Sequence, residues 1–238
     1  MAAFVNETRA ELAELCDVIE WMRVGQLGRM TKFFQRHKVN SAIMAGQIDP
    51  KNLFDLRPDV KTLVMLARLE QRNAESIFGA IADELEKADV TLLPATTYME
   101  DHLATEGNIC GPSLSRKEYG DLEFGFEIAK QVSRMDIGQT VVVKGGTVLA
   151  VEAFEGTNAA ILRGGELGGK DAVIVKVSKP NQDFRFDVPV IGPQTLQTAA
   201  AAKLRVIGVE AGRTLLLERD ALFSAATSAK ISVFGYQL

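Results

Sequence analysis

The sequence predicts an α/β protein with two domains, a parallel-sheet domain at the N-terminus and a mixed α/β domain at the C-terminus. Short apolar runs alternate with helical patterns over residues 1–106, which is the order of a βαβ chain. After residue 140, two β-rich runs flank a Gly-Gly pair, which indicates an antiparallel hairpin. The intervening GNICGPSL, residues 107–114, has the composition of a connector. We therefore place the linker there and the second domain at 115–238.

The N-terminal half contains one clear amphipathic helix between two strands. NAESIFGAIADELEKAD, residues 73–89, repeats apolar residues at helical spacing, and VTLLPAT, residues 90–96, follows as a strand. SAIMAG, residues 41–46, is typical of a buried parallel strand that ends in glycine. Apolar residues at helical spacing also predict a helix at 26–37 and a shorter helical stretch at 10–15.

The C-terminal half alternates strands and helices after a long capped helix. Ser115 is expected to cap a helix that runs to about Arg134, before the hairpin at 140–154. The later elements are predicted, in order, as a strand at 171–178, a helix at 194–204, strands at 205–212 and 213–219, a helix capped by Asp220, and a strand at 232–238. The glycines of RGGELGGK, residues 163–170, lack the spacing of a phosphate loop, and we interpret them as a surface turn.

Composition and charge exclude several classes of function. The formal net charge of −4 argues against a nucleic-acid partner, for which a basic surface is expected. The only cysteines, Cys16 and Cys110, are far apart in the sequence and do not form a disulfide framework. His37 and His102 are too few for a His-rich metal site. Any metal is therefore expected to be a hard cation held by oxygen.

Targeting signals are not evident in the sequence. No run approaches the roughly 20 apolar residues that a membrane-spanning helix needs. Glu7 and Arg9 interrupt the N-terminus before an apolar signal region forms. We therefore expect a cytoplasmic location.

An alternating charged motif is the most informative feature of the chain. In KPNQDFRFDVPVIGP, Asp183, Arg185 and Asp187 alternate with Phe184 and Phe186. An extended strand places alternate side chains on one face, so two carboxylates and a guanidinium are expected together. Neighbouring carboxylates favour a cation between them, and a guanidinium suits phosphate. The alternative is a solvated strand face with an Asp–Arg–Asp ion network. We take the three charged residues as candidate catalytic groups, with Asp187 also a metal ligand.

A second polar cluster precedes a predicted helix. In VEAFEGTN, Glu152 and Glu155 lie ahead of Gly156, and either Thr157 or Asn158 is expected to cap the helix that follows. Backbone N–H groups at a helix start favour an anion. Carboxylates for a metal and a helix start for phosphate are what phosphoryl chemistry requires. Glu152 and Glu155 are thus candidate metal ligands. Gly156, Thr157 and Asn158 are candidate substrate contacts.

Further candidate substrate contacts lie beside these motifs and at a strand end. Lys176 and Lys179 flank the Asp-rich stretch, where they either neutralise a pyrophosphate or are simply exposed. Gln182 immediately precedes that stretch. Gly46 and Gln47 end the strand of the N-terminal half, and ligands of parallel sheets bind at such carboxyl ends.

Taken together, these motifs resemble a known enzyme family. DIGQTVVV, VEAFEGTN, KPNQDFRFDVPVIGPQT and VEAGRTLLL occur in the order and spacing of the LpxI-type UDP-2,3-diacylglucosamine pyrophosphatases of lipid A biosynthesis. VGQLGRM, IMAGQI, LFDLRPD and IADELE extend the resemblance upstream. It covers nearly the whole chain from Leu12 onward.

The resemblance implies a specific reaction and its partners. It implies a Mg²⁺- or Mn²⁺-dependent hydrolase in which water attacks the α-phosphorus of UDP-2,3-diacylglucosamine, giving UMP and 2,3-diacylglucosamine 1-phosphate (lipid X). It also implies a Rossmann-like N-terminal domain, a catalytic C-terminal domain and a substrate between them. The lipid substrate implies peripheral contact with the inner membrane. Oligomeric state is left open.

Departures from the family pattern leave a second class of function open. The family's first βα unit is expected to be missing, so the N-terminal domain is expected to be truncated. Asn158 replaces a carboxylate, and Gln47 replaces a lysine. Asn keeps an oxygen ligand but has no charge and cannot act as a base. The alternative is a non-catalytic nucleotide-sugar or acyl-lipid binding protein on the same fold.

Overall fold

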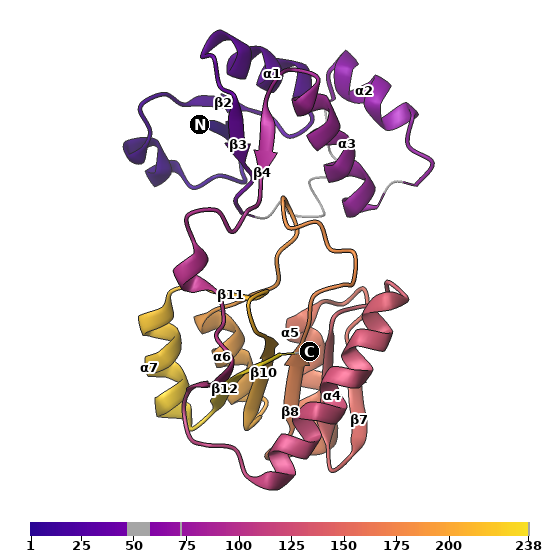
Figure 1. The fold of residues 1–238 in the computed structure, drawn as a ribbon, viewed down its shortest axis with the longest axis vertical. Helices are drawn as coiled ribbons and strands as arrows, with labels where there is room; N and C mark the ends of the chain where they lie inside the picture. The colour runs from indigo at the N-terminus through magenta and orange to yellow at the C-terminus, as the bar shows by residue number, and fades with distance from the viewer. Residues whose placement is uncertain (47–57, 72, 238) are drawn as a thin grey trace. The chain divides into compact units, whose positions relative to one another are not determined.

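The structure separates the chain into two units (Figure 1). The computed structural model describes residues 1–46, 58–71 and 73–237. The N-terminal unit comprises Met1–Thr97 and Asp183–Asp187, and the C-terminal unit comprises Tyr98–Gln182 and Val188–Leu238. Both units mix helices and strands, which confirms the predicted α/β class. The division follows Thr97, and a short segment from the second half of the chain belongs to the first unit.

A six-stranded mixed sheet forms the centre of the C-terminal unit. Its strand order is β5-β12-β10-β8-β6-β7. The strands are β5 Gly107–Cys110, β6 Thr140–Lys144, β7 Thr147–Val151, β8 Val173–Lys176, β10 Val206–Glu210 and β12 Ser232–Tyr236. Strands β8, β10 and β12 are parallel to one another, whereas β6 is antiparallel to both β8 and β7, and β5 is antiparallel to β12. A separate parallel pair joins β9 Val190–Ile191 to β11 Leu215–Leu216.

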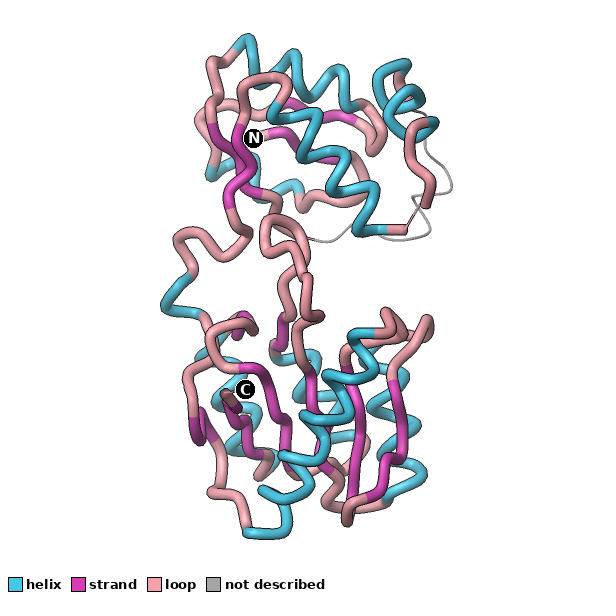
Figure 2. The backbone as a smooth tube through the Cα atoms, turned by 45° about the vertical axis from the view of Figure 1, so that its right-hand side comes forward, coloured by secondary structure: helices cyan, strands magenta, loops and turns pink. Residues whose placement is uncertain are grey.

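Helices cover both faces of this sheet (Figure 2). The helices are α4 Arg116–Arg134, α5 Thr157–Gly168, α6 Pro193–Ala201 and α7 Arg219–Ala229, with a short 3₁₀ turn, η3, at Glu100–His102. Val141, Val143 and Val175 belong to one core cluster with Phe126 of α4, whereas Val142 belongs to the other cluster, which includes residues of α5, α6 and α7. Adjacent strand residues therefore face opposite layers, as the period of two requires.

Local sequence signals predicted several elements of this unit correctly. Ser115 caps α4 through a capping box with Glu118, which satisfies two backbone N–H groups at the helix start. Gly145 and Gly146 both have positive φ and connect β6 to β7, so the predicted hairpin is confirmed. Both turn N–H groups also donate to the Asp121 carboxylate of α4, at 2.8 Å each.

Two predictions for this unit are wrong. Residues 107–110 are not a connector but form strand β5, because β12 supplies hydrogen-bond partners that a local pattern cannot reveal. The glycines near residue 165 are not a surface turn but part of α5. A Cβ on Gly164 would lie 2.5 Å from the Val142 side chain, and one on Gly165 would lie 2.5 Å from the Ala202 carbonyl oxygen. These glycines therefore allow α5 to pack closely on β6 and α6.

The N-terminal unit contains two parallel strand pairs and several helices. Strand β1 Ala2–Phe4 pairs with β2 Glu20–Met22, and β3 Ser41–Ile43 pairs with β4 Thr91–Leu93. The helices are η1 Ala10–Leu15, α1 Leu27–Arg36, α2 Val60–Ala67 and α3 Ala74–Glu86. Strand β3 is parallel as predicted, but Ser41 and Ile43 are exposed rather than buried. Helix α2 was not among the predicted elements.

No helix of the described residues is both long enough and apolar enough to cross a bilayer.

Candidate functional site

The carboxyl ends of the parallel strands gather polar groups at one edge of the C-terminal sheet. Strands β8 and β10 end there, at Lys176 and Glu210. Thr140, the first residue of β6, lies opposite Lys176 because β6 is antiparallel to β8. Val151 ends β7 beside the start of β6, so Glu152 follows at the same edge. Ligands of α/β sheets bind at such carboxyl ends, so this edge is the candidate ligand-binding site of the C-terminal unit.

Three residues predicted from sequence meet at this edge. The Thr157 hydroxyl donates to Glu152 Oε1 at 2.8 Å, and Lys176 Nζ lies 3.4 Å from the same hydroxyl oxygen. Lys176 also donates to the Val190 carbonyl at 3.2 Å. Glu152 is buried at 8% exposure. A Cβ on Gly138 would lie 2.0 Å from the Glu152 carbonyl oxygen, so the absence of a side chain there permits the close backbone approach.

Several buried polar atoms at this edge have no hydrogen-bond partner among the described residues. They are Gln139 Oε1, Thr140 Oγ1, Glu152 Oε2, Gln182 Nε2 and Thr214 Oγ1. Gln139 and Thr140 lie at the start of β6, and the other three residues follow the ends of β7, β8 and β10. A buried polar atom without a partner costs about 1–3 kcal/mol, so a group of them in adjacent segments needs an explanation. A polar ligand that supplies both donors and acceptors would satisfy them.

A buried charge network lies beside these atoms and was missed by the sequence reasoning. Lys130 Nζ of α4 donates to Glu210 Oε2 at 2.8 Å and to the Ser178 carbonyl at 2.9 Å. Ser178 donates to Glu210 Oε2 from its backbone N–H at 2.8 Å and from its hydroxyl at 2.7 Å. Arg213 Nε lies 3.3 Å from Glu210 Oε1 and donates to the Ser178 hydroxyl oxygen at 2.7 Å. This network fixes the segment after β8, which leads to Lys179 and Gln182.

The electrostatics of the network keep Glu210 ionised. Burial alone raises the pKa of Glu210, but hydrogen bonds from Lys130 and Ser178, together with the charge of Lys130, leave the pKa below its ordinary value. One feature of the sequence could have revealed this buried charge network. Glu210 ends the apolar run VIGVE, where a carboxylate at the carboxyl end of a buried strand is unusual.

The start of α5 differs in detail from the prediction. The helix begins at Thr157, and its N-cap is Gly156, with φ of 84°. Neither Thr157 nor Asn158 is the cap, and Asn158 is exposed. Gly156 suits this position because a positive φ disfavours residues with a side chain. The predicted helix start beside Glu152 is present, with its cap one or two residues earlier than expected.

Glu155 does not join Glu152. Its carboxylate pairs with Arg163 at 2.6 Å and accepts the Ala153 N–H at 3.1 Å. A hydrogen bond from its own backbone N–H, followed by the one from Arg163, lowers the pKa of Glu155. Glu155 therefore precedes α5 and is held in an exposed ion pair with Arg163 of that helix.

The Asp-rich segment is a turn and not a strand. Phe186 N and Asp187 N both donate to the Asp183 carbonyl, at 3.2 and 2.9 Å. The predicted alternation of two faces is therefore wrong, because the chain bends back on itself. Arg185 binds Asp183 through Nε at 3.0 Å and Nη2 at 2.6 Å, and this hydrogen bonding lowers the pKa of Asp183. The Asp–Arg ion pair of the alternative interpretation is present.

Packing explains why this segment belongs to the N-terminal unit. The Phe186 ring stacks on Phe78 of α3, with 5.7 Å between ring centroids. Ala95 N, just after β4, donates to the Phe184 carbonyl at 2.8 Å. The phenylalanines thus anchor the turn, and Asp187 is half-buried at its end.

The remaining predicted residues are placed as follows. Lys179 pairs with Asp136, and its backbone N–H donates to Gln182 Oε1 at 2.6 Å. Gln182 is buried, and its Nε2 is one of the atoms without a partner. Gly46 is exposed with φ of 99° after β3, and Gln47 lies outside the described residues.

A preformed metal centre is not found in the part of the chain that the structure describes, since no three His, Cys, Asp or Glu side chains come together there. Asp187 belongs to the N-terminal unit, whereas Glu152 and Glu155 belong to the C-terminal unit. The free oxygen of Glu152 is nevertheless a suitable ligand for a hard cation. Mg²⁺ commonly takes only one or two carboxylates and completes its shell with water and substrate phosphates, so this donor set fits it.

Comparisons with known proteins cover both units. The family model described as the LpxI N-terminal domain matches residues 1–102, and that described as the LpxI C-terminal domain matches residues 105–234. A curated relative, UDP-2,3-diacylglucosamine pyrophosphatase LpxI of Caulobacter vibrioides, is 31% identical over 223 residues. That alignment covers 89% of this chain and 80% of the relative.

Proposed function

This chain belongs to the LpxI family, and we propose that it hydrolyses the pyrophosphate of UDP-2,3-diacylglucosamine to UMP and 2,3-diacylglucosamine 1-phosphate. The observation that carries the proposal is the match of both domains to the family, together with a relative of that activity aligned over 89% of the chain. The unsatisfied polar atoms at the carboxyl edge of the C-terminal sheet support it, because a phosphorylated ligand offers them partners.

The reaction is a displacement at phosphorus. A water oxygen bonds to the α-phosphorus, the bond from that phosphorus to the bridging oxygen breaks, and one water proton is released. The sugar 1-phosphate leaves with the bridging oxygen. We assign binding of the phosphates to Lys176, Lys179, Gln182 and the α5 start at Gly156–Asn158, with Gly46 and Gln47 as further substrate contacts. Positive charge and helix N–H groups stabilise the charge that develops on the phosphoryl oxygens.

A divalent cation is part of the proposal. Glu152 is the ligand with the best structural support, and Glu155 and Asp187 are the other candidates. When bound, Mg²⁺ or Mn²⁺ would supply charge neutralisation and a polarised phosphoryl oxygen. Asp187 and Asp183 are the candidate acid–base and orienting carboxylates, and Arg185 holds Asp183 in place.

Hydrolysis in ¹⁸O-labelled water tests the reaction and its regiochemistry. The purified full chain is incubated with UDP-2,3-diacylglucosamine and Mg²⁺, and the products are analysed by mass spectrometry. We expect one ¹⁸O atom in UMP and none in the sugar phosphate. Label in the sugar phosphate would overturn attack at the α-phosphorus. Tight substrate binding without cleavage, in Mg²⁺ or Mn²⁺, would instead identify the non-catalytic binding protein.

Removal of the cation is the matching control for the metal assignment. Dialysis against a chelator is expected to abolish UMP release, and added Mg²⁺ or Mn²⁺ is expected to restore it. Full activity in the chelator would contradict the metal-dependent mechanism while leaving the hydrolase assignment intact.

A further inference from the structure

Helix α2 presents an apolar face to solvent. Val60, Leu63, Val64 and Ala67 recur at the spacing of one helical face, and all four are exposed. The exposed fractions of Val60, Leu63 and Val64 are 76%, 53% and 46%. The outward face of a surface helix is normally polar. The helix is thus apolar on the side where water contact is greatest.

The inner side of α2 is firmly attached to its own unit. The Asp59 carboxylate caps the helix by accepting the Thr62 N–H at 2.9 Å, and it also accepts Gly28 N–H of α1 at 2.7 Å. The Thr62 hydroxyl donates to the Gly25 carbonyl at 2.6 Å, and Met65 is buried. The orientation of α2 is therefore defined by specific bonds, and its apolar face points outward as a consequence.

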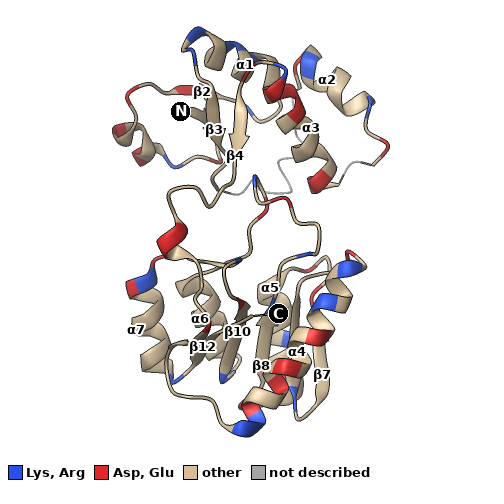
Figure 3. Ribbon diagram, in the orientation of Figure 1, with Lys and Arg blue, Asp and Glu red and all other residues tan. Residues whose placement is uncertain are grey.

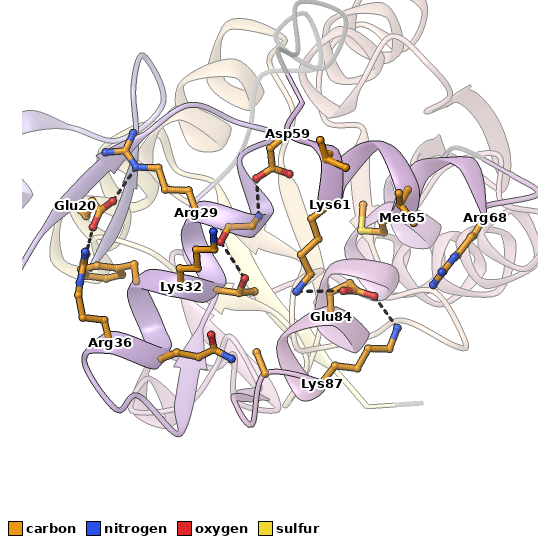
Figure 4. A pocket seen from close by; sticks show the side chains of 17 residues that line it. Glu20, Arg29, Lys32, Arg36, Asp59, Lys61, Met65, Arg68, Glu84 and Lys87 are labelled. Carbon is orange, nitrogen blue, oxygen red and sulfur yellow. Dashed lines mark hydrogen bonds and ion pairs between the residues drawn. The ribbon is translucent and has the colours of Figure 1, made fainter.

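A basic pocket lies directly beside this apolar face (Figure 4). Its volume is about 1190 Å³, and Val60 and Val64 belong to its lining. Helices α1, α2 and α3 supply most of the wall, and Figure 3 marks the basic residues of α1 and α2 in blue. The basic side chains of the lining are Arg29, Lys32, Arg36, Lys61, Arg68 and Lys87.

The acidic side chains of the lining are already engaged. Glu20 binds Arg29 at 2.8 Å and also binds Arg36. Glu84 binds Lys61 at 3.2 Å and Lys87 at 2.6 Å. The third acidic residue, Asp59, caps α2 by accepting the Thr62 N–H.

The pocket therefore has a positive excess that the described residues leave uncompensated. Its lining contains six basic and three acidic residues, so the net charge is 6 − 3 = +3. Lys32 and Arg68 are exposed, and neither forms an ion pair with a described residue. The partner of this surface must match both an apolar stripe and an adjacent positive field.

We propose that α2 and the basic pocket together dock the protein on an anionic lipid bilayer. Valine and leucine side chains would enter the boundary between headgroups and acyl chains, while the neighbouring Lys and Arg side chains would contact lipid phosphates. This placement removes the apolar face from water and compensates the positive charge in one step. The surface is distinct from the polar edge of the C-terminal sheet and does not depend on the chemistry proposed there.

Other occupants fit this surface less well. A second copy of the chain in a two-fold dimer would bring two positive pockets toward each other, and like charges across an interface oppose association. A small soluble anion would compensate the pocket but leave Val60 and Leu63 in water. Only a partner that is both apolar and anionic satisfies the whole surface.

Co-sedimentation of the full chain with vesicles tests the proposal. We expect binding to vesicles of phosphatidylcholine with phosphatidylglycerol, little binding to phosphatidylcholine alone, and a decrease with added salt because exposed charges are screened. Leu63→Ser and Arg68→Gln are each expected to lower the partition coefficient about fivefold, since each removes one apolar or one basic contact with the membrane surface.

Matched variants elsewhere provide the controls. Leu167→Ser replaces a leucine of α5 that is 64% exposed, and Lys117→Gln replaces an exposed lysine of α4. Neither is expected to change vesicle binding, and circular dichroism verifies that every variant is folded. Equal binding to uncharged vesicles, binding unaffected by both Leu63→Ser and Arg68→Gln, or no binding at all would overturn the proposal. A dimer in sedimentation velocity that Leu63→Ser dissociates would assign the surface to a second copy instead.

Discussion

Replacement of Lys130 by methionine removes the central cation of the buried network at the carboxyl edge of the C-terminal sheet. Lys130 Nζ donates to Glu210 Oε2 at 2.8 Å and to the Ser178 carbonyl at 2.9 Å. Methionine keeps most of the aliphatic length but cannot donate. The variant therefore leaves the buried Glu210 carboxylate with fewer partners and frees the carbonyl of Ser178.

The size of the effect follows from what remains. Breaking a buried ion pair by removing one partner costs about 3–5 kcal/mol when the other charge is left uncompensated. Here Arg213 stays 3.3 Å from Glu210, and Ser178 still donates twice to it. We therefore expect the free energy of unfolding of the C-terminal unit to fall by about 2–3 kcal/mol.

The pH dependence of the unfolding free energy should also change in Lys130→Met. The pKa of folded Glu210 is below its ordinary value of 4.5, so its stabilising contribution is complete above that pH and is lost as the pH falls through the lower folded-state pKa. Without Lys130 the folded-state pKa rises. The pH-dependent contribution of Glu210 is consequently smaller in Lys130→Met, which is expected to lose less stability than the wild type as the pH falls below 4.5.

Intrinsic chromophores allow the two units to be followed separately during urea unfolding. The single tryptophan, Trp21, lies in the N-terminal unit, whereas the three tyrosines, Tyr98, Tyr119 and Tyr236, lie in the C-terminal unit. Tyrosine near-ultraviolet signals should show a lower midpoint in Lys130→Met, with the tryptophan emission transition unchanged.

A lysine in a more exposed pair is the control for this experiment. Lys179 pairs with Asp136, whose side chain is 58% exposed, and surface pairs contribute about 0–1 kcal/mol. Lys179→Met should therefore shift the tyrosine transition by less than about 1 kcal/mol. A loss of the same small size in Lys130→Met would refute the argument that the network is buried and cooperative.

Three further predictions address the site and the packing around it. Glu152→Gln should lower UMP release about a hundredfold, the scale for one acid–base or metal-orienting group, while the circular dichroism spectrum stays that of the wild type; near-normal turnover would remove Glu152 from the site. Asp187→Ala should lower turnover by at least about a hundredfold, and Asp183→Ala should be milder if Asp183 mainly holds its neighbouring arginine; steady-state kinetics with Mg²⁺ decide between them, and the reverse order would exchange their roles. Gly164→Ala should destabilise the C-terminal unit by about 1–3 kcal/mol through a clash in the core, whereas Gly120→Ala, with open space around an exposed helix position, should stabilise it by about 0.4–1 kcal/mol; urea unfolding gives both values, and equal effects would contradict the packing argument.

Local patterns were sufficient where neighbours in sequence determine the structure. Ser115 with Glu118 is a helix start that the first turn satisfies by itself. Gly145-Gly146 between β-rich runs is a hairpin because few residues adopt the required backbone angles. Glu152 and Thr157 were selected from a short motif, and their hydrogen bond joins residues only five positions apart.

Local patterns failed where distant segments supply the partners. Residues 107–110 become a strand because β12 pairs with them, although their composition is that of a connector. Asp183 and Arg185 alternate like strand residues, yet the Phe186 ring stacks on Phe78 and the chain turns back on itself there. A period-two pattern indicates a strand only when another strand is available to pair with it.

The sequence by itself determined the α/β class, the capped start of α4, the hairpin and the family motifs, because these depend on residues within about one turn or one strand of each other. The tertiary structure decided which polar groups meet. Glu210 and Lys130 are 80 positions apart and are joined only because α4 packs on a sheet in which β8 and β10 are neighbours. The tertiary structure also decided which side of α2 faces solvent, since the hydrogen bond from Thr62 and the burial of Met65 anchor the opposite side.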